Sequence, residues 1–181
     1  GKGLSGGKIV VQPRNSFTQP SHENVIIGNV TLYGATDGRL YASGQAGDRF
    51  CVRNSGALAI VEGCGANGCE YMTGGSAIIL GNIGDNFGAG MTGGSAFIYS
   101  DQKNISDLMN METISLYEVD NQDWKNHLLD LLKDFYKETK SKRAEFIIEN
   151  YDSEIKKFAH VVPDEVIDKL EFPVTKKSKI A

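Results

Sequence analysis

The chain has 181 residues, enough for one domain, or one domain with an appendage, to bury a core without disulfide bonds. Its 23 acidic and 19 basic residues give a formal net charge of -4, and the lysines near its end are interleaved with acidic residues, which argues against a nucleic-acid partner. No run reaches the roughly 20 apolar residues that a membrane span requires, and no secretory signal opens the sequence, so a soluble, cytoplasmic protein is predicted.

Composition divides the chain into two parts. All 21 glycines lie at or before Gly94, whereas charged residues concentrate after Asp120. We therefore predict a glycine-rich β-helix over residues 1–119 and a helical tail over residues 120–181 that packs on the β-helix or on a partner domain.

The first predicted element is a strand at residues 5–11, where two glycines precede a lysine and the apolar run Ile-Val-Val. A longer segment that contains Pro13 and Pro20 separates this strand from the elements that follow. We expect the strand to belong to an additional coil and the segment to be an inserted loop.

From about Gly28 to Tyr99 the sequence repeats with a period of 19 residues. The clearest copies begin at Gly56, Gly75 and Gly94, and each continues into a short apolar run. In this spacing the predicted columns of stacked residues are Leu40/Ala59/Ile78/Phe97, Tyr41/Ile60/Ile79/Ile98 and Ala42/Val61/Leu80/Tyr99. A glycine-punctuated unit of this length is too short to contain a helix and is typical of a parallel β-helix.

These four coils, with the additional one before them, predict a mainly β fold. We expect a single-stranded, right-handed parallel β-helix (solenoid) with 19-residue coils and a C-terminal α-helical tail, because parallel crossover connections are right-handed. Successive side chains of a strand point to opposite faces, yet all three columns are almost entirely apolar. One face would fill the solenoid, and the tail or a neighbouring domain must cover the other.

The corners of the predicted coils carry Gly, Asn and Asp. The side chains of Asn29, Asp48, Asn67 and Asn86 repeat with the same period, which predicts a hydrogen-bonded ladder of residues that tolerate left-handed conformation. The glycine cluster at residues 81–90 could expose its amides as an anion nest, but close packing of the corners explains it more simply.

After the repeats, residues 111–119 predict a last strand and residues 121–140 an amphipathic helix. Residues 141–151 predict a second helix whose first residue, a serine, is the N-cap. A short third helix is expected over residues 163–170, and residues 176–179 are expected to be a frayed end.

One motif resembles a nucleotide-binding site. Residues 63–68 match GxGxxG directly after an apolar strand, as in a dinucleotide-binding turn. Residues 69–75 cannot form the helix that this motif requires, and the 19-residue period places Gly65 in register with Ala46 and Gly84. We therefore interpret these glycines as corners of the solenoid.

The three cysteines form neither an even disulfide set nor paired CxxC clusters. We predict that Cys51, Cys64 and Cys69 are reduced, buried thiols. The period places Cys69 beside Phe50 and Cys51 beside Glu70, which favours core or wall positions over a metal cage.

The remaining chemical groups suggest no catalytic constellation. His22 lies in the expected loop, His127 in a helix and His160 in the tail, and none is placed beside a nucleophile and a carboxylate. The pair Glu145 and Glu149 fits a solvated helix face. The sequence therefore predicts no catalytic, cofactor-binding or metal-binding residue in this chain.

Three blocks, GKGLSGGKI at residues 1–9, GNVTLYGAT at residues 28–36 and RFCVRNSGA at residues 49–57, occur in this order. Together they resemble the C-terminal GXGXG domain of the glutamate synthase large (alpha) subunit. The closing segment, residues 144–151 followed by FAHVVP at residues 158–163, is similar too, although Asn-Tyr stands where the family has Asn-Trp. The resemblance covers nearly the whole chain.

The resemblance implies a right-handed β-helix with a structural role in glutamate synthase, which makes glutamate from 2-oxoglutarate and glutamine. In that family a glutaminase domain supplies a nucleophilic Cys, and a flavin domain holds FMN and a [3Fe-4S] cluster. None of their motifs occurs in this sequence. The implied function is therefore a non-catalytic scaffold that contacts the glutaminase and FMN-binding domains or subunits and holds them in place.

Two alternatives belong to other classes. A β-helical subunit of another oxidoreductase, such as formylmethanofuran dehydrogenase or a glutamate-synthase-like amine-metabolism enzyme, would share the solenoid, but the similarity of the tail argues against it. A freestanding solenoid enzyme would need an acid, a base and a cation on one face, and the spacing places none together. Without an initiator Met, we expect either a piece of a longer polypeptide or a separate subunit. The electron donor, ferredoxin or NADPH, and the oligomeric state stay open.

Overall fold

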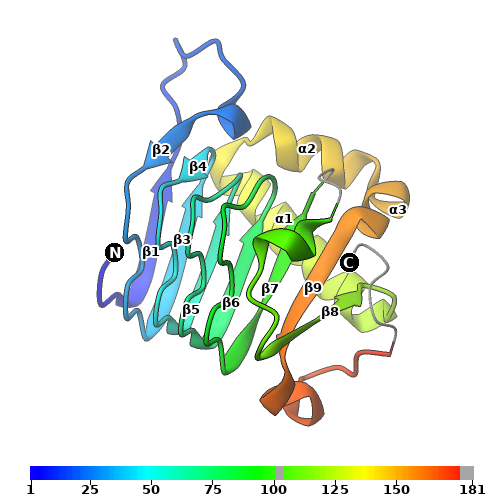
Figure 1. Ribbon diagram of the computed structural model, residues 1–181. Helices are drawn as coiled ribbons and strands as arrows, with labels where there is room; N and C mark the ends of the chain where they lie inside the picture. The colour runs from blue at the N-terminus through cyan, green and yellow to red at the C-terminus, as the bar shows by residue number, and fades with distance from the viewer. Residues whose placement is uncertain (101–103, 176–181) are drawn as a thin grey trace.

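The computed structural model describes residues 1–100 and 104–175 and has a mainly β fold built around a parallel solenoid (Figure 1). Seven strands of these residues form one sheet in the order β1-β3-β5-β6-β7-β9-β8. Their bounds are Ser5–Val11 (β1), Asp37–Ala42 (β3), Ser55–Val61 (β5), Thr73–Ile79 (β6), Gly93–Tyr99 (β7), Ile114–Glu118 (β8) and Phe158–Pro163 (β9). Strands β2 (Val25–Ile27) and β4 (Gln45–Ala46) form a second, small parallel sheet. The predicted β-helical fold is confirmed.

The additional first coil is also confirmed. Strand β1 pairs in parallel with β3, with Ile9 opposite Leu40 and Val11 opposite Ala42. The chain between β1 and β2 forms the predicted inserted loop and contains one short 3-10 helix, η1 (Ser21–Glu23). Strand β1 is therefore the first edge of the main sheet (Figure 1).

The period of 19 residues first fails at the corner between β5 and the next coil. Ala42 pairs with Val61, but Ala46 pairs with Cys64. The corner after Val61 is therefore one residue shorter than the corner after Ala42. Ser55 still pairs with Gly74, but from Leu58 to Val61 each residue of β5 pairs with the residue of β6 that lies 18 positions later.

The predicted columns are therefore wrong from the third coil onward. Ile78 lies opposite Ile60 and Ala77 opposite Ala59, whereas the uniform period had placed Ile78 beside Ala59. Pairing between β6 and β7 returns to the spacing of 19 residues, with Ile78 opposite Phe97. The observed columns are Leu40/Ala59/Ala77/Ala96, Tyr41/Ile60/Ile78/Phe97 and Ala42/Val61/Ile79/Ile98.

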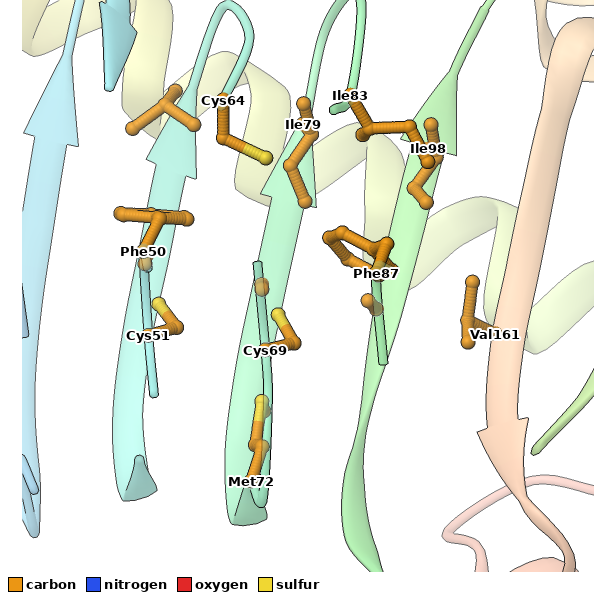
Figure 2. Packing of buried hydrophobic residues seen from close by; sticks show 14 of the residues in the cluster. Phe50, Cys51, Cys64, Cys69, Met72, Ile79, Ile83, Phe87, Ile98 and Val161 are labelled. Atoms are coloured by element: carbon orange, nitrogen blue, oxygen red, sulfur yellow. The ribbon is translucent and has the colours of Figure 1, made fainter. Parts of the chain in front are cut away.

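Both faces of the sheet are buried where the apolar columns lie, in the second halves of β3, β5, β6 and β7. The inner face fills the solenoid with small and branched side chains and meets Phe50, Met72 and Phe87 from the opposite wall (Figure 2). The outer face packs against the helices. The outer cluster consists of the sheet residues Tyr41, Ile60, Ile78, Leu80, Phe97, Tyr99 and Phe158 and of Val119, Trp124, Leu128, Leu132, Phe135, Ala144, Ile147 and Ile155.

The helices that cover the outer face have the predicted positions. Helix α1 (Gln122–Thr139) is capped by the Asn121 side chain, which accepts a hydrogen bond from the Asp123 amide. Helix α2 (Lys142–Glu149) is capped by Ser141, whose hydroxyl accepts from the Ala144 amide at 3.0 Å. Both helices lie behind the sheet in Figure 1.

The rest of the tail is less helical than predicted. Short helical turns follow at α3 (Tyr151–Glu154) and η3 (Ile155–Lys157), and the expected third helix is a 3-10 helix, η4 (Asp164–Lys169). Between η3 and η4 lies β9, which pairs antiparallel with both β7 and β8. Another 3-10 helix, η2 (Ile105–Leu108), precedes β8. The expected frayed end at residues 176–179 lies outside the described residues.

The corners opposite the main sheet use left-handed backbone at regular positions. Each coil has three such residues, at alternating positions: Val30, Leu32 and Gly34; Arg49, Cys51 and Arg53; Asn67, Cys69 and Tyr71; and Asn86, Gly88 and Gly90. The predicted Asn/Asp ladder is formed only in part. Asn29 accepts from the Asp48 amide, and Asn86 donates to Asn67, but Asp48 accepts from the Ala66 amide because of the shortened coil.

One glycine column determines how closely the strands of successive coils can approach. A Cβ at Gly74 would lie 2.3 Å from the Ser55 carbonyl oxygen, and one at Gly93 would lie 2.1 Å from that of Thr73. Both contacts are with backbone of the neighbouring coil, which cannot move aside without separating the strands.

His160 is the most unusual buried group of the sheet. It has no exposed surface, neither ring nitrogen has a hydrogen-bond partner, and its ring stacks on Phe97 at 4.1 Å and meets Trp124 at 4.8 Å. Burial lowers the pKa of His160 to about 3, with a smaller contribution from the nearby His127. The side chain is therefore neutral at pH 7 and serves as an aromatic core residue.

We predict that Gly74→Ala lowers the free energy of unfolding by about 2–3 kcal/mol, the usual effect of overpacking. Gly28→Ala is the matched control, because a Cβ there meets nothing within 4 Å, and its effect should stay within about 0.5 kcal/mol. Urea denaturation of the three proteins measures both effects. Equal stability of the two variants would contradict the close-contact argument.

We predict that acid destabilises the protein through His160. The unfolded chain binds a proton near pH 6.5 and the folded chain only near pH 3, so stability is full above pH 6.5 and falls as the pH drops through this window. Between pH 7.5 and pH 5 the loss attributable to His160 is about 2 kcal/mol. Denaturation of His160→Phe at both pH values should lack this part of the loss, whereas His22→Gln should retain it. An unchanged pH dependence in His160→Phe would show that other groups cause the acid sensitivity.

Candidate functional site

The GxGxxG match at residues 63–68 lies in a corner of the solenoid and leads to β6, with no helix after it. Its glycines are required by contact with neighbouring coils: a Cβ at Gly65 would lie 2.1 Å from Asp48 Oδ1, and one at Gly68 would lie 2.8 Å from the Phe87 ring. Gly84 is in register with Gly65 as predicted, but Ala46 pairs with Cys64. The geometry is that of packed corners.

The three cysteines are free, buried thiols, as predicted. Cys51 and Cys69 occupy equivalent positions of adjacent coils, so the predicted stacking of Cys69 on Phe50 and of Cys51 on Glu70 is wrong, again because of the shortened coil (Figure 2). The Cys69 amide nevertheless donates to the Phe50 carbonyl at 2.7 Å. A hydrogen bond with Cys51 and burial raise the pKa of Cys69, and burial raises the pKa of Cys64. Cys64 and Cys69 are therefore protonated core residues at neutral pH.

His22 lies apart from the other two histidines, whereas His127 and His160 both contact the Trp124 ring. His22 is in η1 of the inserted loop, 3.9 Å from Glu23, His127 is on α1 with its ring 5.7 Å from that of Trp124, and His160 is buried in β9. Within residues 1–100 and 104–175 no group of three or more His, Cys, Asp or Glu residues could hold a metal ion. The prediction that the chain has no catalytic, cofactor-binding or metal-binding residue remains a prediction.

A buried carboxylate, Glu62, was not identified from the sequence. Its side chain has no exposed surface, and Oε1 accepts hydrogen bonds from Ser43 Oγ at 3.1 Å and from Ser141 Oγ, while Oε2 has no partner. Because Ser141 is the N-cap of α2, this contact joins a corner of the solenoid to the start of that helix. The only sequence signal was an acidic residue directly after an apolar strand.

A groove lies between the inserted loop and the junction of α1 with α2. Its volume is about 900 Å³. One wall is formed by residues 12–22, and the other by Ser43, Thr139, Lys140, Lys142, Arg143 and Phe146. Sequence reasoning missed this groove because its walls are more than a hundred positions apart in the chain.

The described part of the chain contains no helix with the length and apolar character that a membrane crossing needs. A second hollow, with a volume of about 610 Å³, lies between α1 and the segment from α3 to the start of β9. Lys125, Lys156, Asp120 and Asp152 line that second hollow, so its charges are mixed. In the groove, by contrast, the Lys and Arg residues of the lining are not accompanied by any Asp or Glu.

Comparison with known proteins identifies the solenoid. The family described as GXGXG motif matches residues 1–164. The glutamate synthase [NADPH] large chain of Azospirillum brasilense is 50% identical over 174 residues, which are 96% of this chain and 12% of that protein. The corresponding large chain of Bacillus subtilis (strain 168) is 45% identical over 164 residues, 90% of this chain and 11% of that protein.

Relatives named for another electron donor are similar to a comparable degree. The ferredoxin-dependent glutamate synthase of Pyropia yezoensis is 44% identical over 163 residues, 90% of this chain and 11% of that protein. The chain thus spans about a tenth of the length of the relatives it matches. The chain therefore belongs to the GXGXG motif family and is homologous to one segment of glutamate synthase large chains.

Proposed function

We propose that this chain is a non-catalytic structural domain of glutamate synthase that holds the glutaminase and FMN-binding parts of the enzyme in place. The observation that carries the proposal is its homology to a segment that makes up about a tenth of several glutamate synthases. The holoenzyme reaction, formation of glutamate from glutamine and 2-oxoglutarate, would take place on the other segments.

The internal construction of the fold supports this role. Where the apolar columns lie, both faces of the main sheet are packed, the inner face in the solenoid and the outer face against α1 and α2. The starts of β3, β5 and β6 instead line an open hollow of about 610 Å³. A solenoid enzyme would need polar groups converging on an exposed strand face, and the outer strand residues here are Tyr41, Ile60, Ile78 and Phe97 in contact with a helix. A solenoid with a continuous core of this kind is suited to fixing the relative positions of larger domains.

The residues of this chain do not fit the cofactors implied by the family. An iron–sulfur cluster needs Cys thiolates that converge on one point, but Cys64 lies on a different corner from Cys51 and Cys69, and all three are buried in the apolar core. The GxGxxG match is closed by contacts between coils and gives no helix N-terminus for a phosphate of FMN. We therefore place FMN and the [3Fe-4S] cluster in the partner segments.

The chain is similar to relatives that are named for different electron donors. Relatives named for NADPH, NADH and ferredoxin are all 40% identical or more. A scaffold that is common to enzymes with different donors agrees with a role away from the electron-transfer site. The same relatives disfavour the alternative of a subunit from an unrelated oxidoreductase.

A structural role predicts that the polar groups of this chain can be replaced without loss of catalysis. In complete glutamate synthase, Cys64→Ala and His127→Gln should leave kcat and KM for glutamine and 2-oxoglutarate within about twofold of the wild type. Removal of a general acid, base or nucleophile would instead lower kcat by about 10²-fold or more. Steady-state assays of variants with unchanged melting temperature make this distinction.

Association of this chain with the rest of glutamate synthase is a second test of the proposed function. The chain, made separately, should co-elute with the FMN-containing remainder of glutamate synthase in size-exclusion chromatography and should itself show no visible absorbance. A chromophore bound to this chain alone, glutamine hydrolysis by this chain alone, or failure to co-elute would overturn the proposed function.

A further inference from the structure

The groove between residues 12–22 and the α1–α2 junction has a charge opposite to that of the whole chain. Arg14, Lys140, Lys142 and Arg143 line it, and none of its lining residues is Asp or Glu, although the chain has a formal net charge of -4. Such a local excess of one sign attracts a partner of the other sign.

Several of these cations keep their charge available to solvent. Arg14 and Lys140 form no ion pair with the described residues, and the Lys142 side chain is 86% exposed. Lys142 does contact Glu145 at 2.8 Å, outside the lining, and Glu23 lies beside His22 at 3.9 Å. These two carboxylates offset part of the positive charge but leave an excess of cations.

The same groove carries exposed aromatic side chains. Phe17 is 43% exposed and Phe146 is 49% exposed. Phe17 belongs to the inserted loop and Phe146 to α2, so the two lie on opposite walls of the groove. Aromatic and Arg side chains are the residues most often found at the centre of protein interfaces. Phe146 is on the face of α2 opposite to the buried Ala144 and Ile147, so the solenoid core does not explain it.

Resting on the proposed function, we propose that this groove is the docking surface for an acidic polypeptide segment from another part of glutamate synthase, with an apolar side chain placed between Phe17 and Phe146. A small anion is less well matched, because apart from Ser43 and Thr139 most of the lining is exposed, and no buried cation converges on one point. About nine-tenths of each relative lies outside the matched segment, so ample chain exists to supply the partner.

The test uses a zero-length carbodiimide on complete glutamate synthase, because this reagent joins a Lys amine to a carboxylate that it already touches. Mass spectrometry should find Lys140 and Lys142 linked to Asp or Glu residues outside this chain. Because exposed charge pairs are screened within about 3 Å at 1 M salt, the links should weaken in 1 M NaCl. Links only within this chain, only to a second copy of it, or none at all would overturn the inference.

Charge reversal supplies the matched comparison. In Arg14→Glu/Lys142→Glu the links from Lys140 should fall at least about fivefold, whereas Lys133→Glu/Lys169→Glu, with the same change in net charge at exposed sites elsewhere, should leave them unchanged. Equal links in both variants would contradict the inference. If Lys140 and Lys142 react freely with acetic anhydride in the holoenzyme and are protected only by added succinate, the groove binds a small anion instead.

The outcomes separate this inference from the proposed function. A chain that does not associate with the remainder of glutamate synthase contradicts the proposed function itself. A chain that associates normally while Lys140 and Lys142 stay unlinked contradicts only the assignment of the groove.

Discussion

Everything in this fold depends on the distance between successive coils. Parallel strands must lie about 4.8 Å apart for their hydrogen bonds to form, and at the start of each strand this brings Gly56, Gly74 and Gly93 against a carbonyl group of the preceding coil. On the opposite wall, three left-handed residues per coil repeat in step, and their amides donate to the neighbouring coil, as from Arg49 to Ala66. Because the coils stack, the residue missing from one corner also shifts the pairing along the following wall and strand.

The shortened corner explains why the sequence predicted the fold but not the register. The 19-residue period correctly indicated a solenoid, since glycines and apolar runs recur together. The columns on both faces are apolar, however, so Ile78 and Ile79 are equally acceptable on either face and the pattern cannot reveal a shift of one residue. The pairing of Cys69 with Cys51 and the interrupted Asn/Asp ladder are consequences of the same missing residue.

Sequence patterns also could not predict how the solenoid ends. Strand β9 reads as FAHVVP, a short apolar run that does not distinguish a strand from a buried helical turn, and its partner β7 lies some sixty residues earlier. Antiparallel pairing with β7 ends the series of parallel coils, because no further coil can continue on the reversed strand. The buried, neutral His160 at its centre follows from this position, since β9 is covered by helix α1 on one face and by the solenoid core on the other.

Glu62 connects this architecture to the groove. A buried polar side chain is costly unless it is hydrogen-bonded, and here Oε1 accepts hydrogen bonds from the Ser43 and Ser141 hydroxyls. Because Ser141 is the N-cap of α2, this contact joins the solenoid to the start of that helix. Arg143, two residues after Ser141, donates to the Leu80 carbonyl at 3.0 Å and lies over the Tyr99 ring. The start of α2 is therefore fixed to the solenoid at two points, and the cationic wall of the groove is held rigid against the core. No sequence pattern could indicate this arrangement, because it arises only when the tail folds back over the coils.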